Sequence, residues 1–186
     1  MARRPVVALL TDFGLAEHYV GVMKGVIASI TPDAQLIDIS HAVPPQDVLA
    51  GQWLLRASVR CFPPGTVFLA VVDPGVGTRR RPLGLRSAPW LFVGPDNGLF
   101  TPWLDRADVV ELRETRFRLP EVSATFHGRD IFAPAAAFLA RGEPLTGFGP
   151  SISDAIRLEP PAPARRDDGT MAVSYTHLTL PTILRV

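Results

Sequence analysis

Four short polar clusters in this chain contain residue types that can carry chemistry, and each follows an apolar run that is expected to be a strand. Taken singly, each cluster is as readily explained as a turn or a helix cap, for which Asp, Asn, Gly and Pro are the usual residues. Together they supply carboxylates, guanidinium groups and one imidazole. The clusters are Thr11-Asp12-Phe13-Gly14, Asp73-Pro74-Gly75-Val76-Gly77-Thr78 with the three arginines after it, Gly94-Pro95-Asp96-Asn97-Gly98 and Phe126-His127-Gly128-Arg129-Asp130.

The elements between these clusters predict an α/β fold, with a layered and mostly parallel sheet flanked by helices. In such a sheet, ligands bind outside the carboxyl ends of the strands, so clusters at successive strand ends should meet in one crevice. The periodicity of apolar residues predicts strands over 6–10, 35–40, 66–72 and 108–112, a hairpin over 83–86 and 90–93, and helices over 19–30, 47–60 and 130–139, the second helix capped by Asp47.

Composition changes towards the C-terminus, where residues 142–169 are rich in proline and polar side chains. This pattern predicts an N-terminal α/β catalytic domain over 1–150 and a linker over 151–172 that leads to a C-terminal domain missing from this chain. The segment Val-Ser-Tyr-Thr-His-Leu-Thr-Leu-Pro-Thr resembles the translation of a sequencing adapter. Residues 173–186 are therefore interpreted as read-through rather than native sequence, with a genuine Thr-rich strand as the alternative.

The bulk properties exclude several classes of function. With 47% hydrophobic residues, 20% charged residues and a net charge of +1, the 186-residue chain is globular and is not an electrostatic binder of nucleic acid. The single cysteine, Cys61, allows no internal disulfide and no multi-thiolate metal site, which fits a reducing cytoplasm. The apolar run over 6–10 is too short for a signal sequence or a membrane span, so no membrane partner is expected.

Common catalytic signatures are missing from the sequence. It contains no Gly-x-x-x-x-Gly-Lys-Ser/Thr phosphate loop, no His-Glu-x-x-His metal motif and no Gly-x-Ser-x-Gly nucleophile elbow. The Asp-Phe-Gly and His-Gly-Arg-Asp segments occur in the wrong order for a protein kinase. The chemistry must therefore be sought in the four clusters themselves.

Taken in order, five motifs resemble the family of S-adenosylmethionine (SAM) hydroxide adenosyltransferases, the adenosine-forming SAM hydrolases related to fluorinase and chlorinase. The resemblance runs from about residue 6 to residue 150. It implies an α/β domain followed by a small β-barrel, which this chain lacks, and homotrimers with the SAM site between one front domain and a neighbour's barrel. It also implies that SAM is the substrate and that no cofactor or metal is needed. The motifs are Thr-Asp-Phe-Gly, Tyr-Val-Gly-Val-Met-Lys-Gly, Val-Val-Asp-Pro-Gly-Val-Gly-Thr, Gly-Pro-Asp-Asn-Gly-Leu and His-Gly-Arg-Asp.

The same resemblance implies a catalytic triad of Asp73, Arg80 and His127. These groups would position and activate water in line with the bond between C5′ and the sulfonium of SAM, releasing adenosine and methionine. Arg79 and Arg81 flank Arg80, so the register of the arginine is open by one residue. Either the histidine or the aspartate can accept the proton, and the sequence does not decide between them.

Three further residues are implied to contact the substrate. Asp12 is expected to accept hydrogen bonds from the ribose hydroxyls, since an ionised carboxylate is only an acceptor. Glu17 occupies the position of an acidic residue near the methionine ammonium. Asn97 either contacts the nucleoside or only holds its own turn.

Three alternatives to the hydrolase remain. The first is a halogenase of the same superfamily. Such an enzyme looks as if it has tyrosine in place of Asp73, and fluorinase has serine in place of Gly128. The carboxylate at position 73 argues against a halogenase because it would repel the halide anion. The second is a non-catalytic module that binds SAM or adenosine. The third is an α/β scaffold without a small-molecule site, which leaves the four clusters unexplained.

Overall fold

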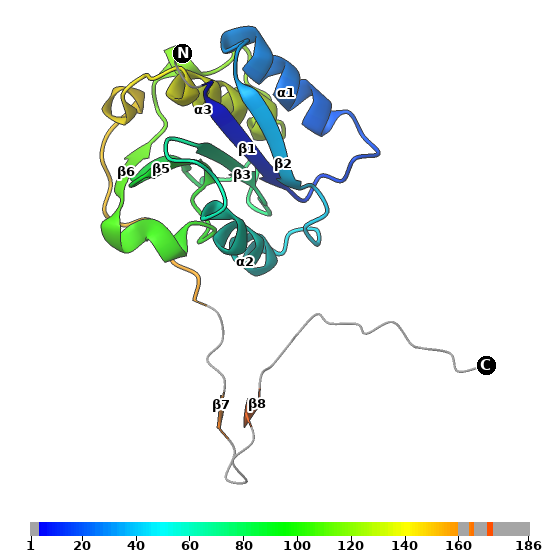
Figure 1. Ribbon diagram of the computed structural model, residues 1–186, viewed down its shortest axis with the longest axis vertical. Helices are drawn as coiled ribbons and strands as arrows, with labels where there is room; N and C mark the ends of the chain where they lie inside the picture. The colour runs from blue at the N-terminus through cyan, green and yellow to red at the C-terminus, as the bar shows by residue number, and fades with distance from the viewer. Residues whose placement is uncertain (1–3, 160–163, 166–170, 173–186) are drawn as a thin grey trace, which may run out of the picture.

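The computed structural model describes residues 4–159, 164–165 and 171–172, and its main body is a sheet between two layers of helices (Figure 1). The six strands run in the order β2-β1-β3-β5-β4-β6. Their bounds are β1 Val6–Thr11, β2 Gln35–Ser40, β3 Val67–Val71, β4 Pro82–Ser87, β5 Trp90–Pro95 and β6 Asp108–Glu111. The predicted strands are therefore present, with ends that differ by one or two residues.

The sheet is mixed: three of its five strand pairings are parallel, in line with the predicted mostly parallel sheet, and two are antiparallel. β2, β1, β3 and β5 are parallel to one another, whereas β4 is antiparallel to both β5 and β6. Only Ala88 and Pro89 connect β4 to β5. So short a connection can join only antiparallel neighbours, because a parallel crossover needs a dozen or more residues. The α/β class and the hairpin are confirmed.

Helices cover both faces of the sheet because the central strands bury alternate residues on opposite sides. Val7 and Leu9 of β1 belong to the apolar cluster that includes the inner faces of α1 and α3, whereas Ala8 and Leu10 pack with residues of α2. All six residues of β1 are buried. The bounds of these helices are α1 Tyr19–Ile30, α2 Val48–Val59 and α3 Ala133–Ala140.

A capping residue defines where α2 begins, whereas α3 follows a π-helical turn. The Asp47 carboxylate accepts a 2.9 Å hydrogen bond from the backbone N of Ala50, which confirms the predicted cap of α2. The predicted helix over 130–139 begins instead with a π-helical turn, η3, over Gly128–Phe132, and α3 follows it directly. Three short 3₁₀ helices complete the domain: η1 Thr101–Arg106, η2 Thr115–Phe117 and η4 Leu145–Phe148.

The first part of the predicted linker packs against the domain. Ile152, Ala155 and Leu158 contact the apolar cluster on the α2 side of the sheet, and the backbone N of Leu158 donates a 2.8 Å bond to Thr101 Oγ1. Further along, β7 Ala164–Arg165 pairs antiparallel with β8 Met171–Ala172. The predicted read-through over 173–186 lies outside the described residues.

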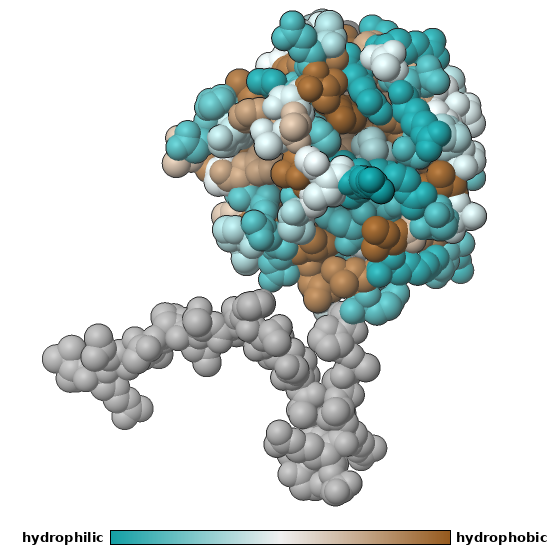
Figure 2. Space-filling view, turned by 180° about the vertical axis from the view of Figure 1, so that it is seen from behind, coloured by the Kyte–Doolittle hydropathy of each residue, from teal (hydrophilic) through white to brown (hydrophobic). Residues whose placement is uncertain are grey.

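The surface mixes polar and apolar residues, as Figure 2 shows for one face, where brown patches are interrupted by teal. Among the described residues, no helix combines the length and apolarity needed to cross a membrane. Large apolar side chains that are nevertheless exposed include Leu15, Trp53 and Val122. Leu15 directly follows the Thr-Asp-Phe-Gly motif, in the loop that also contains Glu17. Val122 lies five residues before His127, in the loop that leads to it.

Candidate active site

The parallel strands bring the polar clusters to one edge of the sheet. Thr11, the last residue of β1, pairs with Val71, the last residue of β3, so the loops that carry Asp12 and Asp73 start side by side. β5 runs parallel to β3 and ends at Pro95, within the third cluster. The predicted crevice at the carboxyl ends of the strands therefore has a structural basis.

Asp73, Arg80 and His127 form one hydrogen-bonded cluster. Nε of Arg80 donates to Asp73 Oδ1 at 3.0 Å and to Oδ2 at 2.9 Å, and Nη2 of Arg80 donates to Oδ2 at 2.5 Å. The same Nη2 lies 2.8 Å from Nδ1 of His127. The side chains of Arg80 and Asp73 are only 6% and 4% exposed. Arg80 thus joins a carboxylate and an imidazole that are 54 positions apart in the chain.

The neighbouring arginines do not take part in this cluster. Arg79 is exposed, whereas Arg81 pairs with the Asp96 and Asp154 carboxylates at 2.7 Å each. Of the three consecutive arginines, Arg80 is therefore the one that contacts the other predicted triad members. The geometry therefore favours Arg80 among the three arginines, and its catalytic role stays a prediction.

The contact with Arg80 determines the tautomer of His127. A guanidinium group can only donate hydrogen bonds, so Nδ1 must be the acceptor and the proton of the neutral ring sits on Nε2. Burial lowers the pKa of His127 below its ordinary value, and the adjacent Arg80 cation lowers it further. The imidazole is therefore kept neutral, with Nε2 as a hydrogen-bond donor.

Arg80 has one donor group that the cluster leaves unused. Nη1 is buried and has no hydrogen-bond partner among the described residues. The rest of the guanidinium is fixed, because Nε and Nη2 hold Asp73 and the group lies over the Phe132 ring at 5.0 Å from its centre. A buried donor without a partner is costly, so a ligand or a water molecule that accepted its hydrogen bond would be favoured.

Local backbone structure brings Arg80 into place. Thr78 Oγ1 donates to Gly75 O at 2.7 Å and accepts from the Arg80 N at 3.3 Å, which folds residues 75–80 into a compact turn. Gly77 has a positive φ of 79°, and a Cβ at this position would lie 3.1 Å from the Ala124 O. The glycine therefore allows the loop before His127 to approach the loop after Asp73.

Asp12 and Glu17 lie in a more open part of the edge. Asp12 Oδ2 accepts a 2.8 Å bond from the backbone N of Gln46, while Oδ1 has no hydrogen-bond partner among the described residues. The buried His41 stabilises the loop after β1 by two contacts. Its Nδ1 lies 2.8 Å from Thr11 Oγ1, and its backbone O accepts a 2.8 Å hydrogen bond from the Gly14 N. Glu17 is exposed.

The Asn97 side chain is occupied within its own turn. Nδ2 donates to the Val72 O at 2.8 Å, and Oδ1 accepts from the Leu99 N at 3.2 Å. Asn97 therefore ties the end of β5 to the residue that precedes Asp73. Of the two roles predicted for this residue, the geometry supports the one that holds the turn, and the contact with a nucleoside stays a prediction.

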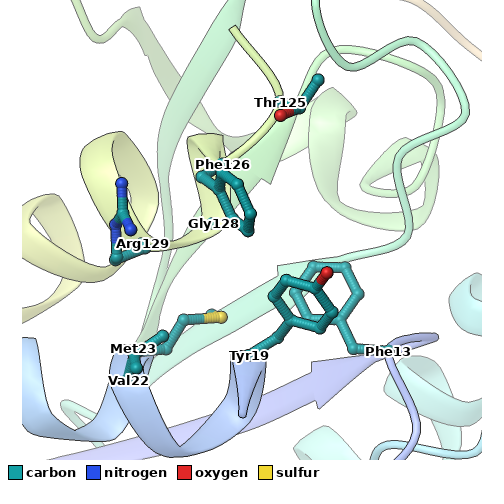
Figure 3. A pocket seen from close by; sticks show the side chains of 8 residues that line it. All are labelled: Phe13, Tyr19, Val22, Met23, Thr125, Phe126, Gly128 and Arg129. Carbon is teal, nitrogen blue, oxygen red and sulfur yellow. The ribbon is translucent and has the colours of Figure 1, made fainter. Parts of the chain in front are cut away.

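A cavity of about 210 Å³ is lined by Phe126 and Gly128, the residues on either side of His127 in the sequence, while the His127 side chain is not part of the lining (Figure 3). Rings of Phe13, Tyr19 and Phe126 border it, together with Met23 and Arg129. The Tyr19 and Phe126 rings are stacked at a tilt, with centres 5.4 Å apart. The sequence did not predict these aromatic residues as a group, although Phe13 and Tyr19 lie in two of the motifs and Phe126 lies in the fourth polar cluster. Only the fold brings α1 beside η3.

Comparison with known proteins identifies relatives of the whole described domain. A family model described as the SAM hydroxide adenosyltransferase N-terminal domain matches residues 7–149. A protein named (R)-S-adenosyl-L-methionine hydrolase from Salinispora tropica is 45% identical and covers 90% of this chain and 66% of its own length. A protein of the same name from Thermus thermophilus is 48% identical, with 80% and 62% covered.

More distant relatives and solved structures agree with this assignment. A protein named fluorinase from Nocardia brasiliensis is 31% identical, with 82% of this chain and 59% of that protein covered. The crystal structure of an uncharacterized conserved protein from Thermotoga maritima matches with a TM-score of 0.81 at 42% identity, over 84% of this chain and 62% of that one.

The chain thus spans 59 to 66% of the length of these relatives. The motifs, the mixed α/β sheet and the family match all agree. The chain belongs to the SAM hydroxide adenosyltransferase family and carries its N-terminal domain over residues 7–149.

Proposed function

We propose that this site hydrolyses SAM to adenosine and methionine by attack of water on C5′. The observation that carries the proposal is the buried cluster of Asp73, Arg80 and His127, in which Arg80 Nη1 is left as a free donor beside a neutral imidazole. Relatives that are 45% and 48% identical bear the name (R)-S-adenosyl-L-methionine hydrolase. Both lines support the same reaction.

The tautomer of His127 assigns the roles within this reaction. Nε2–H of His127 and Nη1–H of Arg80 are donors, so they hold the oxygen after it has lost a proton: a hydroxide has three lone pairs, two of which accept these hydrogen bonds while the third attacks C5′. As the new C–O bond forms, the C5′–S bond breaks and its electron pair neutralises the sulfonium. Asp73, the only carboxylate in the cluster, accepts the proton that the oxygen loses.

The aromatic cavity suits the sulfonium end of the substrate. Faces of Phe and Tyr rings attract cations, and the cavity is bordered by three such rings directly beside the His127 loop. The Arg129 charge at the same cavity is offset by the Asp130 carboxylate, which Arg129 Nε contacts at 2.5 Å. Asp12 Oδ1 remains available for the ribose hydroxyls.

Halide chemistry is disfavoured at this site by two observations. The Asp73 carboxylate is 4% exposed, so a halide beside it would meet a negative charge in poorly solvated surroundings. At Gly128, a Cβ would lie 3.2 Å from Met23 Sδ and 3.3 Å from a Phe13 ring carbon. A serine there would require Met23 or Phe13 to move.

Full binding of SAM is proposed to need structure beyond this domain. The relatives are longer than this chain, and the resemblance implies that a neighbour's barrel closes the site within a trimer. Exposed Glu17 and Leu15 stand where such a cover would contact the open side of the site. Trimer formation, the missing C-terminal barrel and a cytoplasmic location stay predictions of the sequence.

The reaction can be tested in water labelled with heavy oxygen. SAM is incubated with the 186-residue chain and with residues 1–172 extended by the C-terminal third of the Salinispora tropica relative, and the products are separated by chromatography. We expect labelled adenosine and unlabelled methionine from the extended chain and little turnover from the shorter one. Binding of SAM without turnover in both would identify a non-catalytic module, and formation of a halogenated nucleoside in the presence of halide would identify a halogenase.

A further inference from the structure

We propose that Asp130 is a positioning residue that fixes the loop over 119–127 so that His127 meets Arg80. His127 itself belongs to the proposed triad, whereas Asp130 has no part in that mechanism. The kinetic part of the inference rests on the proposed function. Its structural part, the placement of His127, does not.

Asp130 contacts the loop at three separate points. Its Oδ2 accepts a 2.8 Å hydrogen bond from the Ser123 N, and its backbone O accepts one of 2.9 Å from the Leu119 N. Its own backbone N donates to the Phe126 O at 2.9 Å. The loop is thus tied near its start, in its middle and at the residue just before His127.

The negative charge of Asp130 also helps to hold the loop, through an ion pair with Arg129. The residue is 0% exposed, and a buried carboxylate needs compensation. Arg129 supplies it, with Nε 2.5 Å from Oδ1 and Nη2 3.1 Å from Oδ2. The same Arg129 guanidinium lies 5.0 Å from the centre of the Phe126 ring, so the ion pair also holds the residue before His127.

A π-helical turn places His127 and Asp130 on the same support. Within η3, the Ala133 N bonds to the Gly128 O five residues earlier, and His127 is the residue that precedes the turn. π-helical turns of this kind are rare and occur frequently at functional sites. On its other side the loop meets Gly77, where a Cβ would make a tight contact of 3.1 Å with the Ala124 O. His127 is therefore held between the Asp73 loop and the Asp130 anchor.

A residue that only stabilised the fold would lower the melting temperature without altering His127. The discriminating measurement is the pKa and tautomer of His127. NMR of the ring nitrogens in the 186-residue chain reports both, and the His127 signal is assigned by its absence in His127→Asn. Arg80, Asp73, Arg118 and Asp130 are the charged groups that act on this ring. The measurement needs no substrate, so it is independent of the proposed reaction.

Two substitutions of Asp130 separate its charge from its hydrogen bond. Asp130→Asn keeps an acceptor for the Ser123 N but removes the negative charge, so His127 should keep its tautomer and its pKa should fall further. Asp130→Ala removes both, so the loop should loosen, the Nδ1 contact with Arg80 should be lost and the His127 pKa should rise toward 6.5. The two variants are thus expected to move the same pKa in opposite directions.

Thr31→Val is the matched control. It removes a buried hydrogen bond of 2.9 Å between Thr31 Oγ1 and the Ala137 O, which joins α1 to α3 away from His127. We expect a lower melting temperature and an unchanged His127. If both Asp130 variants leave the His127 pKa and tautomer as Thr31→Val does, the proposal is wrong. Should Asp130→Ala not fold, an unchanged or raised pKa in Asp130→Asn is by itself sufficient to overturn it.

Turnover of SAM by the extended chain gives the second readout. Displacement of His127 by about 1 Å can cost roughly 100-fold in rate, so Asp130→Ala should lower kcat by about 10- to 100-fold with little change in KM. Thr31→Val should leave both constants unchanged. If the unsubstituted extended chain does not hydrolyse SAM, the proposed function fails, while the NMR titration still decides the role of Asp130.

Discussion

The loops after β3 and β1 begin at the same edge of the sheet, but they are built differently. After β3, Asp73 and Arg80 are almost fully buried and are linked to His127 by hydrogen bonds of 2.5 to 3.0 Å. After β1, Asp12 is half-buried and has a single side-chain contact, while Glu17 is exposed. The groups proposed to act on water are thus already assembled, whereas those proposed to bind the substrate are open.

This difference follows from the kind of work each loop is proposed to do. Groups that orient a water molecule gain from being fixed before the reaction, because no reorganisation is then needed in the transition state. Groups that bind a substrate must admit it first, and the proposed cover over the β1 loop lies outside this chain. Substitutions in the first loop should therefore affect rate and folding, and those in the second should affect affinity.

The largest effect is expected from His127→Asn. Loss of the imidazole removes the donor that holds the attacking water, so kcat for SAM should fall about 100- to 10,000-fold while KM changes far less. The measurement is adenosine formation by the extended chain at saturating SAM. Asp105→Asn, which alters an 81% exposed carboxylate, is the control and should be fully active. Normal turnover by His127→Asn would remove the proposed mechanism.

The next effect concerns folding. Arg80→Met leaves the buried Asp73 carboxylate without its partner, which should lower the free energy of unfolding by about 3–5 kcal/mol. Adding Asp73→Asn to the same chain removes that charge and should restore part of the loss. Denaturant titration measures both. The control is Arg157→Met, whose partner Asp105 is 81% exposed, and it should lower the free energy of unfolding by less than about 1 kcal/mol. An equal loss of stability in Arg80→Met and Arg157→Met would mean that the triad is not a buried unit.

A smaller effect is expected in the β1 loop. Asp12→Asn weakens the acceptor for the ribose hydroxyls, so KM should rise by about 10-fold with kcat nearly unchanged. Glu17→Gln should raise KM less, because an exposed charge pair contributes little. Initial rates over a range of SAM concentrations give both constants. A kcat loss as large as that of His127→Asn would contradict the separation between the two loops.

The smallest effect is on the pH dependence of stability. Since the pKa of His127 is lowered in the folded chain, the unfolded chain binds more protons just below 6.5. This contribution is therefore complete above about pH 6.5 and is lost as the pH falls from there toward the folded pKa. Melting temperatures measured across this range should decline less in His127→Asn than in the unsubstituted chain. Parallel declines in the two proteins would show that His127 is not held neutral.

Some of the structure could be predicted because local patterns are sufficient for it. The buried strand over 6–10 and the Asp47 cap of α2 follow from apolar periodicity and capping chemistry, which act over a few residues. The predicted mostly parallel sheet is mixed, with three parallel and two antiparallel pairings, and the hairpin that makes it mixed was itself predicted. The sequence of the strand over 108–112 does not indicate which strand it pairs with. In the structure it is the edge strand β6, paired antiparallel with β4.

The sequence by itself was sufficient for the family and the α/β class, because ordered motifs and periodicity are properties of the chain itself. The six candidate site residues were implied by the resemblance and stay predictions. Tertiary structure decided which of three adjacent arginines meets Asp73, that Asn97 holds its turn, and that His127 is neutral with its proton on Nε2. It also brought the Asp130 carboxylate to the loop that precedes His127 and gathered the rings of Phe13, Tyr19 and Phe126 around one cavity. These features depend on distance, burial and hydrogen-bond geometry between segments far apart in the chain, which no local pattern records.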